Sequence, residues 1–226
     1  MPDDEELFLR IIAGLDEGGV LQKVVLIGSW ALRVYQTHFD NDPQVPVLTT
    51  TDVDFLVPNP PRLGTRFDVG RMLTGLGFDT DWASVGGYCK YESPDMEVEF
   101  LAPSRQPDRT KPVPVDELST VAQPLEYVSL AYDQSMIVRH HGHDVRVPLP
   151  EAFVVLKLLV VPKRKDSQKR RKDILTVREL GGFLAELPDA GARFGTIVSS
   201  IPKKWQRTAY SVATEHCPEL AFLLRL

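Results

Sequence analysis

The stretch of sequence that decides the fold is TDVDF at residues 51–55, in which two acids alternate with apolar residues. Side chains of a β-strand point alternately to opposite faces, so Asp52 and Asp54 should share one face of a strand. Acidic residues are rare in strands, and two carboxylates on one face repel each other unless a cation lies between them. The stretch therefore predicts a strand that presents a pair of carboxylates to a divalent cation.

A second stretch, MEVEF at residues 96–100, repeats this alternation with Glu97 and Glu99. If the two strands are neighbours, three or four carboxylates project from the same part of the sheet. Oxygen ligands of this kind suit Mg²⁺ or Mn²⁺. The two stretches together predict an oxygen-rich metal site.

Upstream, the run VVLIGSWAL at residues 24–32 predicts a short buried strand, a turn at Gly28-Ser29 and then a helix. Glycine permits the backbone to approach a ligand closely, and the N–H groups at a helix start can bind phosphate. Gly28 and Ser29 are therefore candidate phosphate-binding residues. The alternative is that Ser29 is an ordinary helix N-cap.

Residues 24–32, 51–55 and 98–101 together resemble the signature of the DNA polymerase β-like nucleotidyltransferase superfamily. The gap of 24 positions between Gly28 and Asp52 is longer than the usual pattern. The resemblance implies an α+β fold in which a mixed sheet with flanking helices precedes a mostly helical C-terminal region. It also implies that an NTP is the substrate and that Asp52 and Asp54 hold the metals. Glu99 would complete the metal site or accept a proton, with Glu97 as the alternative third carboxylate.

Two later segments, FVVLKLL at residues 153–159 and KRRKDI at residues 169–174, are similar to the AbiEii-type branch of minimal bacterial nucleotidyltransferases. Burial of a lone ammonium is costly, so Lys157 must extend to solvent or meet an anion, either a triphosphate, Asp173 or Glu151. The resemblance implies that Lys157 neutralises the triphosphate and that Asp173 belongs to the site. Because this branch includes toxins of toxin–antitoxin pairs, an antitoxin protein is an implied partner.

The segment Lys163–Lys172 carries seven positive charges in ten residues. A solvated loop explains such a run as well as a surface for a polyanionic acceptor such as tRNA, whose phosphates would be bound without reading the sequence. Residues 1–115 contain 18 acidic and 10 basic side chains, whereas residues 116–226 contain 13 and 16. We therefore expect the metal ligands in the first part and phosphate-binding cations in the second.

The resemblance implies a nucleotidyltransferase catalytic core over residues 1–115 and a C-terminal hairpin and helical region over residues 116–226 that completes the site. Proline-rich residues 103–116 are expected to form a loop, and residues 125–131 a strand. Alternating residues 135–148 predict a hairpin that turns at the histidines of residues 140–143. Helices are expected over 151–161 and 168–186.

The overall composition favours a cytoplasmic protein without a membrane partner. No apolar run reaches 18 residues, and the acidic N-terminus lacks the charge pattern of a signal peptide. The two cysteines, Cys89 and Cys217, form no disulfide or metal-binding spacing. We expect a metal-dependent transferase that moves an NMP from an NTP to a hydroxyl on RNA, protein or a small molecule. The alternative is a catalytically inactive nucleotide-binding protein of the same fold.

Overall fold

The computed structural model describes residues 2–48, 50–82, 87–104 and 111–225. Its centre is a mixed sheet whose strands are ordered β1-β2-β5-β4-β3, with β7 beside the end of β5 and β6 outside β7. The pairs β2–β5 and β5–β7 are parallel, and the other pairs in this sheet are antiparallel. The strands are β1 (Val25–Ile27), β2 (Asp52–Leu56), β3 (Asp79–Trp82), β4 (Cys89–Glu92), β5 (Glu97–Pro103), β6 (Val113–Val115) and β7 (Thr120–Leu125).

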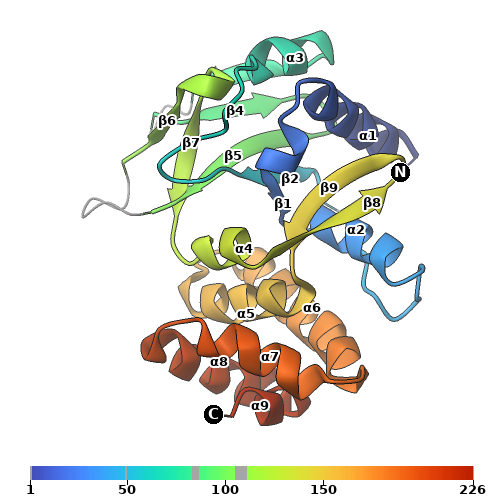
Figure 1. The fold of residues 1–226 in the computed structure, drawn as a ribbon, viewed down its shortest axis with the longest axis vertical. Coiled ribbons are helices and arrows are strands. Elements are labelled where there is room, and N and C mark those ends of the chain that lie inside the picture. The colour runs from blue at the N-terminus through green and yellow to red at the C-terminus, as the bar shows by residue number, and fades with distance from the viewer. Residues whose placement is uncertain (1, 49, 83–86, 105–110, 226) are drawn as a thin grey trace.

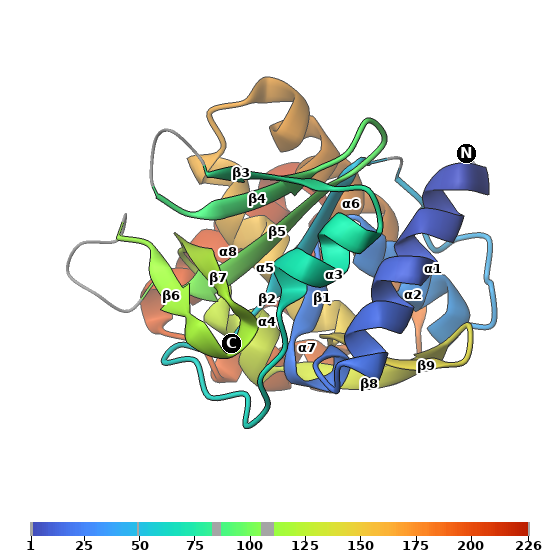
Figure 2. The same ribbon diagram turned by 90° about the horizontal axis from the view of Figure 1, so that it is seen from above.

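Helices cover both faces of this sheet (Figure 1, Figure 2). On one face lie α1 (Pro2–Glu17) and α3 (Val69–Gly75), and α2 (Trp30–His38) follows β1 directly. Phe55 and Phe100 stack within the sheet with ring centroids 5.8 Å apart. Phe8 of α1 stacks on Trp30 of α2 at 4.2 Å. Val53 and Phe55 on the apolar face of β2 are fully buried.

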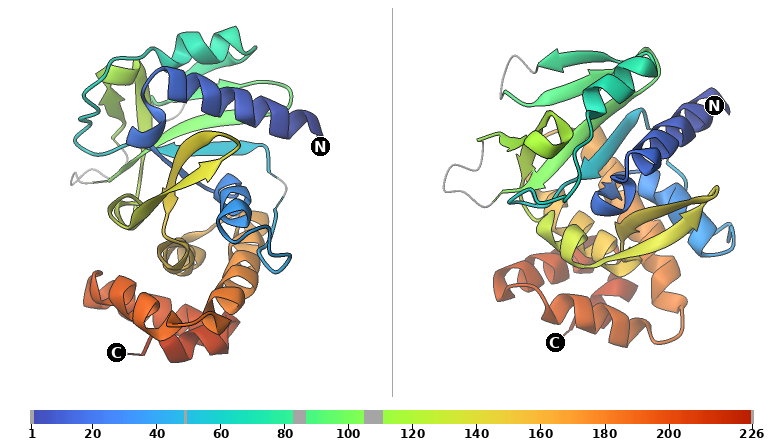
Figure 3. Two further views of the ribbon diagram at one scale, coloured as in Figure 1. Left: turned by 45° about the vertical axis from the view of Figure 1, so that its right-hand side comes forward. Right: turned by 45° about the horizontal axis from the view of Figure 1, so that its top comes forward.

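The C-terminal region is helical and lies on the side of the sheet away from α1 and α3 (Figure 3). It begins with α5 (Pro150–Val160), which is apolar around nearly its whole circumference and is correspondingly buried. Around α5 pack α6 (Ser167–Glu186), α7 (Ala190–Ser199) and α8 (Lys203–His216), and α9 (Pro218–Leu223) packs against α6, α7 and α8. The predicted fold class, a mixed sheet followed by a mostly helical region, is confirmed.

A separate hairpin, β8 (Ser135–His140) with β9 (His143–Pro148), joins the two parts. Strand β9 lies beside β1 and α1, and the Tyr35 hydroxyl of α2 donates a hydrogen bond to the carbonyl of Pro148 at 2.9 Å. The predicted hairpin and its turn are therefore confirmed. The proposed boundary at residue 115 stays a prediction; the hydrogen bonds of the sheet run across it through β7.

Two local predictions are wrong. Residues 125–131 do not form a strand, because β7 ends at Leu125 and a short helix, α4 (Ser129–Asp133), buries Leu130 and Ala131. The predicted loop over 103–116 contains strand β6, which buries Val113 and Val115 and exposes Pro114. Proline is tolerated there because β6 is an edge strand. Residues 105–110 of that loop lie outside the described part of the chain.

Among the described residues, no helix is both long and apolar enough to cross a membrane.

Candidate active site

The two acidic pairs lie on neighbouring parallel strands. In the register of β2 and β5, Asp52 is opposite Glu97 and Asp54 is opposite Glu99. The intervening Val53 is fully buried, whereas both aspartates remain partly accessible. All four acidic side chains therefore project from one face of the sheet, as the alternation predicts. We call these four residues the carboxylate wall.

Asp54 lies deepest in this wall. Burial, together with the neighbouring charges of Glu99 and Asp52, raises the pKa of its carboxyl group to about 7, against the opposing effect of Lys157 and Lys169. The excess of negative charge around Asp54 is the environment that a divalent cation would relieve. The oxygen donors of Asp52, Asp54 and Glu99 thus fit Mg²⁺ or Mn²⁺.

Lys90 of β4 lies between the two glutamates of the carboxylate wall. Its ammonium group is 2.7 Å from a carboxylate oxygen of Glu97 and 2.7 Å from one of Glu99. Burial alone would lower the pKa of Lys90, but its hydrogen bonds to Glu97 and Glu99 raise it above the ordinary value. Burial raises the pKa of Glu99, while Lys90 counteracts that shift. Lys90 therefore stays positively charged and holds Glu99 in place.

Gly28 approaches Asp54 so closely that any side chain at this position would displace the Asp54 carboxylate. Its φ is +71°, and a Cβ added there would lie 2.5 Å from a carboxylate oxygen of Asp54. Ser29 precedes α2 at the N-cap position, but its side chain makes no capping hydrogen bond. Its hydroxyl is therefore not committed to an ordinary helix cap.

The helices α5 and α6 supply positive charge opposite the carboxylate wall. Asp173 of α6 is almost fully buried and binds Lys157 at 2.6 Å and Arg164 at 2.7 Å. Burial would raise the pKa of Asp173, but the charges of Lys157 and Arg164 outweigh it and lower that pKa. Asp173 is thus the anion that Lys157 meets in this structure. Glu151, the other acidic candidate, is 2.8 Å from Arg193 instead.

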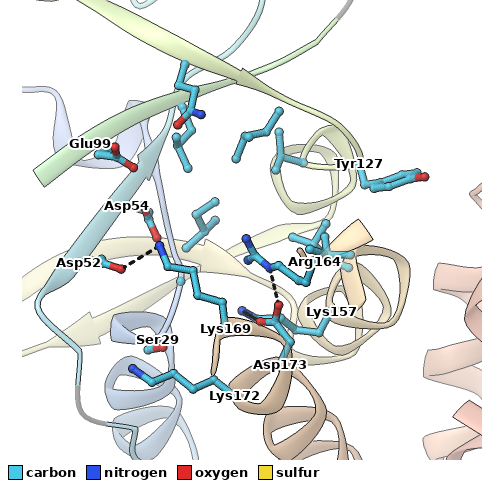
Figure 4. Close-up of a pocket in the computed structure, with 18 of the residues that line it drawn as sticks. Ser29, Asp52, Asp54, Glu99, Tyr127, Lys157, Arg164, Lys169, Lys172 and Asp173 are labelled. Atoms are coloured by element: carbon cyan, nitrogen blue, oxygen red, sulfur yellow. Dashed lines mark hydrogen bonds and ion pairs between the residues drawn. The ribbon is translucent and has the colours of Figure 1, made fainter. Parts of the chain in front are cut away.

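The basic segment 163–172 is divided by the fold. Lys163, Arg164, Lys169 and Lys172 line the same cavity as the carboxylate wall, and Lys169 approaches Asp52 at 3.5 Å (Figure 4). Lys165, Arg170 and Arg171 do not line it and are exposed. We call Lys157, Arg164, Lys169 and Lys172 the cationic wall.

One cavity of about 540 Å³ lies between the two walls and has a size typical of a site for a small ligand. All the residues predicted from the sequence line it, namely Gly28, Ser29, Asp52, Asp54, Glu97, Glu99, Lys157 and Asp173. Within the described part of the chain, no three His, Cys, Asp or Glu side chains already converge as a metal-ligand set. Mg²⁺ at nucleotide sites is commonly held by one or two carboxylates together with substrate phosphates.

A family model described as nucleotidyltransferase matches residues 6–190, which is most of the chain and includes both walls. The chain belongs to this nucleotidyltransferase family. The predicted superfamily is thereby confirmed, whereas the AbiEii-type branch stays a prediction. No curated protein matches the sequence.

The fold is similar to that of one solved structure, and a second solved structure aligns with most of the chain. An antigenic nucleotidyltransferase-like protein from Paracoccidioides brasiliensis aligns with 98% of this chain and 92% of its own, at 15% identity and a TM-score of 0.53. ANT(2″)-Ia in complex with adenylyl-2″-tobramycin aligns with 96% of this chain and 100% of its own, at 13% identity. Its TM-score is 0.47.

Sequence reasoning did not single out Lys90 or the contact of Lys169 with Asp52 in this nucleotidyltransferase. The alternation of Lys90 with Cys89 and Tyr91 indicates that it leaves their buried face, but only the register of β4 with β5 places it beside Glu99. No local pattern in the sequence indicates that Lys169 lies near Asp52, because its position depends on how α6 packs against α5.

Proposed function

We propose that this nucleotidyltransferase moves an NMP from an NTP to a hydroxyl acceptor in a reaction that depends on Mg²⁺ or Mn²⁺. The observation that carries the proposal is the single cavity in which the carboxylate wall faces the cationic wall. A carboxylate cluster suits divalent cations, and lysine and arginine suit a triphosphate. A nucleotide with bound metal is the ligand whose charges match both walls at once.

The phosphates would enter between Gly28-Ser29 and the cationic wall. Gly28 leaves room for close approach beside Asp54, and the N–H groups at the start of α2 would be available to bind a phosphate there. Lys169 is 58% exposed, so it can leave Asp52 and bind a phosphate instead. Lys157 is held rigidly by Asp173 and would offer a fixed positive charge.

In the transfer itself, the acceptor oxygen forms a bond to the α-phosphorus, and the bond from that phosphorus to the β-phosphate oxygen breaks. Pyrophosphate leaves, and the proton of the acceptor hydroxyl passes to a carboxylate of the carboxylate wall, for which Glu99 is the candidate. Asp52 and Asp54, with Glu99 assisting, would hold the divalent cation, which when bound would stabilise the negative charge on the reacting phosphate. Lys157 and Lys169 neutralise the departing pyrophosphate.

The test is a labelling experiment with each α-³²P-NTP, Mg²⁺ or Mn²⁺, and a total cell extract. Label should appear in RNA, protein or a small molecule, and should be absent with EDTA or with the Asp52→Ala/Asp54→Ala variant. The labelled fraction identifies the acceptor, including tRNA. The toxin hypothesis predicts, in addition, growth arrest on expression that the same variant relieves.

The alternative function is an inactive nucleotide-binding protein of the same fold. It would bind an NTP in calorimetry but transfer no label in an extract that supports a known nucleotidyltransferase. The presence of both Asp52 and Asp54 beside Gly28 favours the active enzyme, because nucleotide binding alone does not require a carboxylate pair.

A further inference from the structure

A second cavity of about 550 Å³ adjoins the first. Four residues line both cavities, namely Leu125, Glu126, Tyr127 and Lys163. The second cavity extends from this shared wall toward Lys204 and Trp205 at the start of α8. Transfer between two substrates requires that the acceptor reach the nucleotide, and a cavity that shares a wall with the nucleotide site provides that access.

Tyr127 stands where the two cavities meet. Its φ is +68°, a left-handed conformation that is unusual for a bulky residue and that turns the chain after β7. Its ring lies edge-on to Trp205, with centroids 4.9 Å apart. In Figure 4, Tyr127 lies at the opposite end of the pocket from Asp52 and its ring points away from the carboxylate wall. The pair forms an aromatic wall in the second cavity.

Among the described residues that line the second cavity, two lysines and two acids carry charge. Lys163 is 61% exposed and lies 3.5 Å from Glu126, and the other two are Lys204 and Asp133. This set has no net negative charge that would select a polycationic acceptor. Exposed lysines next to aromatic rings are instead the combination that binds single-stranded nucleic acids, through phosphates and stacked bases.

We propose that this second cavity binds the acceptor, and that the acceptor is the terminal nucleotide of a single-stranded nucleic acid. Its base would pack against Tyr127 and Trp205, and its phosphates would bind Lys163 and Lys204. The terminal hydroxyl would then point across the shared wall toward the carboxylate wall. This inference rests on the proposed nucleotidyl transfer. The proposed site is distinct from general charge attraction by the basic segment 163–172, because Arg170 and Arg171 of that segment line neither cavity.

The experiment measures two bindings separately with the full chain. Binding of a fluorescent ATP analogue (mant-ATP) with Mg²⁺ reports the nucleotide site. Fluorescence anisotropy of 5′-fluorescein-labelled 12-nucleotide RNA and DNA of the same sequence reports the acceptor site. Comparison of the two affinities shows whether this site binds RNA or DNA. Lys203→Gln is the matched control for Lys204→Gln, because Lys203 precedes it on the same exposed turn but does not line the cavity. Trp205→Phe keeps a ring and controls for Trp205→Leu.

We expect Lys204→Gln to weaken oligonucleotide binding about 5-fold and to reduce the salt slope by about 0.7, the value for one phosphate contact on a single strand. Trp205→Leu should weaken it about 10-fold, and Trp205→Phe much less. Lys203→Gln should bind like the wild type, and all variants should bind mant-ATP normally. Tm values close to wild type confirm that each variant is folded.

Equal effects of Lys203→Gln and Lys204→Gln, or no effect of Trp205→Leu, would overturn the inference, because binding would then be a general charge effect. Failure of wild type to bind either oligonucleotide while it binds mant-ATP would also overturn it and would leave the nucleotidyl-transfer proposal intact. Failure of wild type to bind mant-ATP would overturn that underlying proposal itself.

Discussion

The carboxylate wall and the cationic wall face each other across one cavity but are built differently. The carboxylates are short side chains on adjacent strands, so the backbone register of β2 and β5 places them. The cations are long side chains on and near α5 and α6, and acids hold three of them: Asp173 binds Lys157 and Arg164, and Asp52 binds Lys169. The comparison teaches that one wall is positioned by its backbone and the other by counter-ions. Substitutions in the two walls should therefore have different consequences.

The largest effect should come from Asp54→Asn. Nucleotidyl transfer should fall at least about 1,000-fold, because the buried carboxylate at the centre of the carboxylate wall is lost and no neighbour can replace its charge. Initial rates of label transfer measure this effect. Lys169→Gln is the comparison in the cationic wall and should cost only about 10-fold, because Lys169 is exposed and other cations remain nearby. Equal losses would break the contrast between the two walls.

The next effect concerns stability and should be confined to the cationic wall. Asp173→Asn should lower the free energy of unfolding by about 3 kcal/mol, because it leaves Lys157 and Arg164 close together without their buried counter-ion. Urea denaturation measures the change. Asp166→Asn on the same helix is the control, since asparagine serves as well as aspartate at that exposed N-cap. A similar loss in both variants would argue against counter-ion positioning.

Gly28→Ala tests whether the backbone positions the carboxylate wall. The added Cβ would meet Asp54 at 2.5 Å and displace it, so label transfer should fall about 100-fold. Gly19→Ala is the control, because Gly19 also has a positive φ of +64° but has no atom within 4 Å of an added Cβ. Both variants should lose about 1 kcal/mol of stability from backbone strain, and only Gly28→Ala should lose activity. Loss of activity in Gly19→Ala would show that backbone strain alone reduces label transfer.

The smallest effect is the pH dependence of the carboxylate wall without metal. The pKa of Asp54 is about 7 in the folded protein, above its ordinary value of 3.8, so the folded state binds this proton more tightly than the unfolded state. The stability that this provides is present at low pH and is lost as the pH rises through about 7. Asp54→Asn has no such titration. In EDTA, the free energy of unfolding of Asp54→Asn minus that of wild type should therefore increase by about 2 kcal/mol between about pH 5 and 8. Thermal unfolding at several pH values measures this, and a constant difference would contradict it.

Much of the carboxylate wall could be predicted from the sequence, because its signal is local. The alternation in residues 51–55 and 96–100 places each acidic pair on one face of its strand, whatever the strand pairs with. The apolar residues of 153–159 likewise predict a buried helix around Lys157. The turn after β7 could not be predicted in this way. Residues 125–131 are apolar enough for a strand, but the left-handed conformation of Tyr127 ends the extended chain there.

The sequence by itself determined which side chains share a face, because that depends only on the period of a strand or a helix. Only the tertiary structure decided that β2 and β5 are parallel neighbours, that Lys90 joins Glu97 to Glu99, and that Lys169 lies opposite Asp52. These contacts join segments far apart in the chain. They form because hydrogen bonds between strands and the packing of α5 and α6 act between whole elements, and no local pattern of residues encodes those distances.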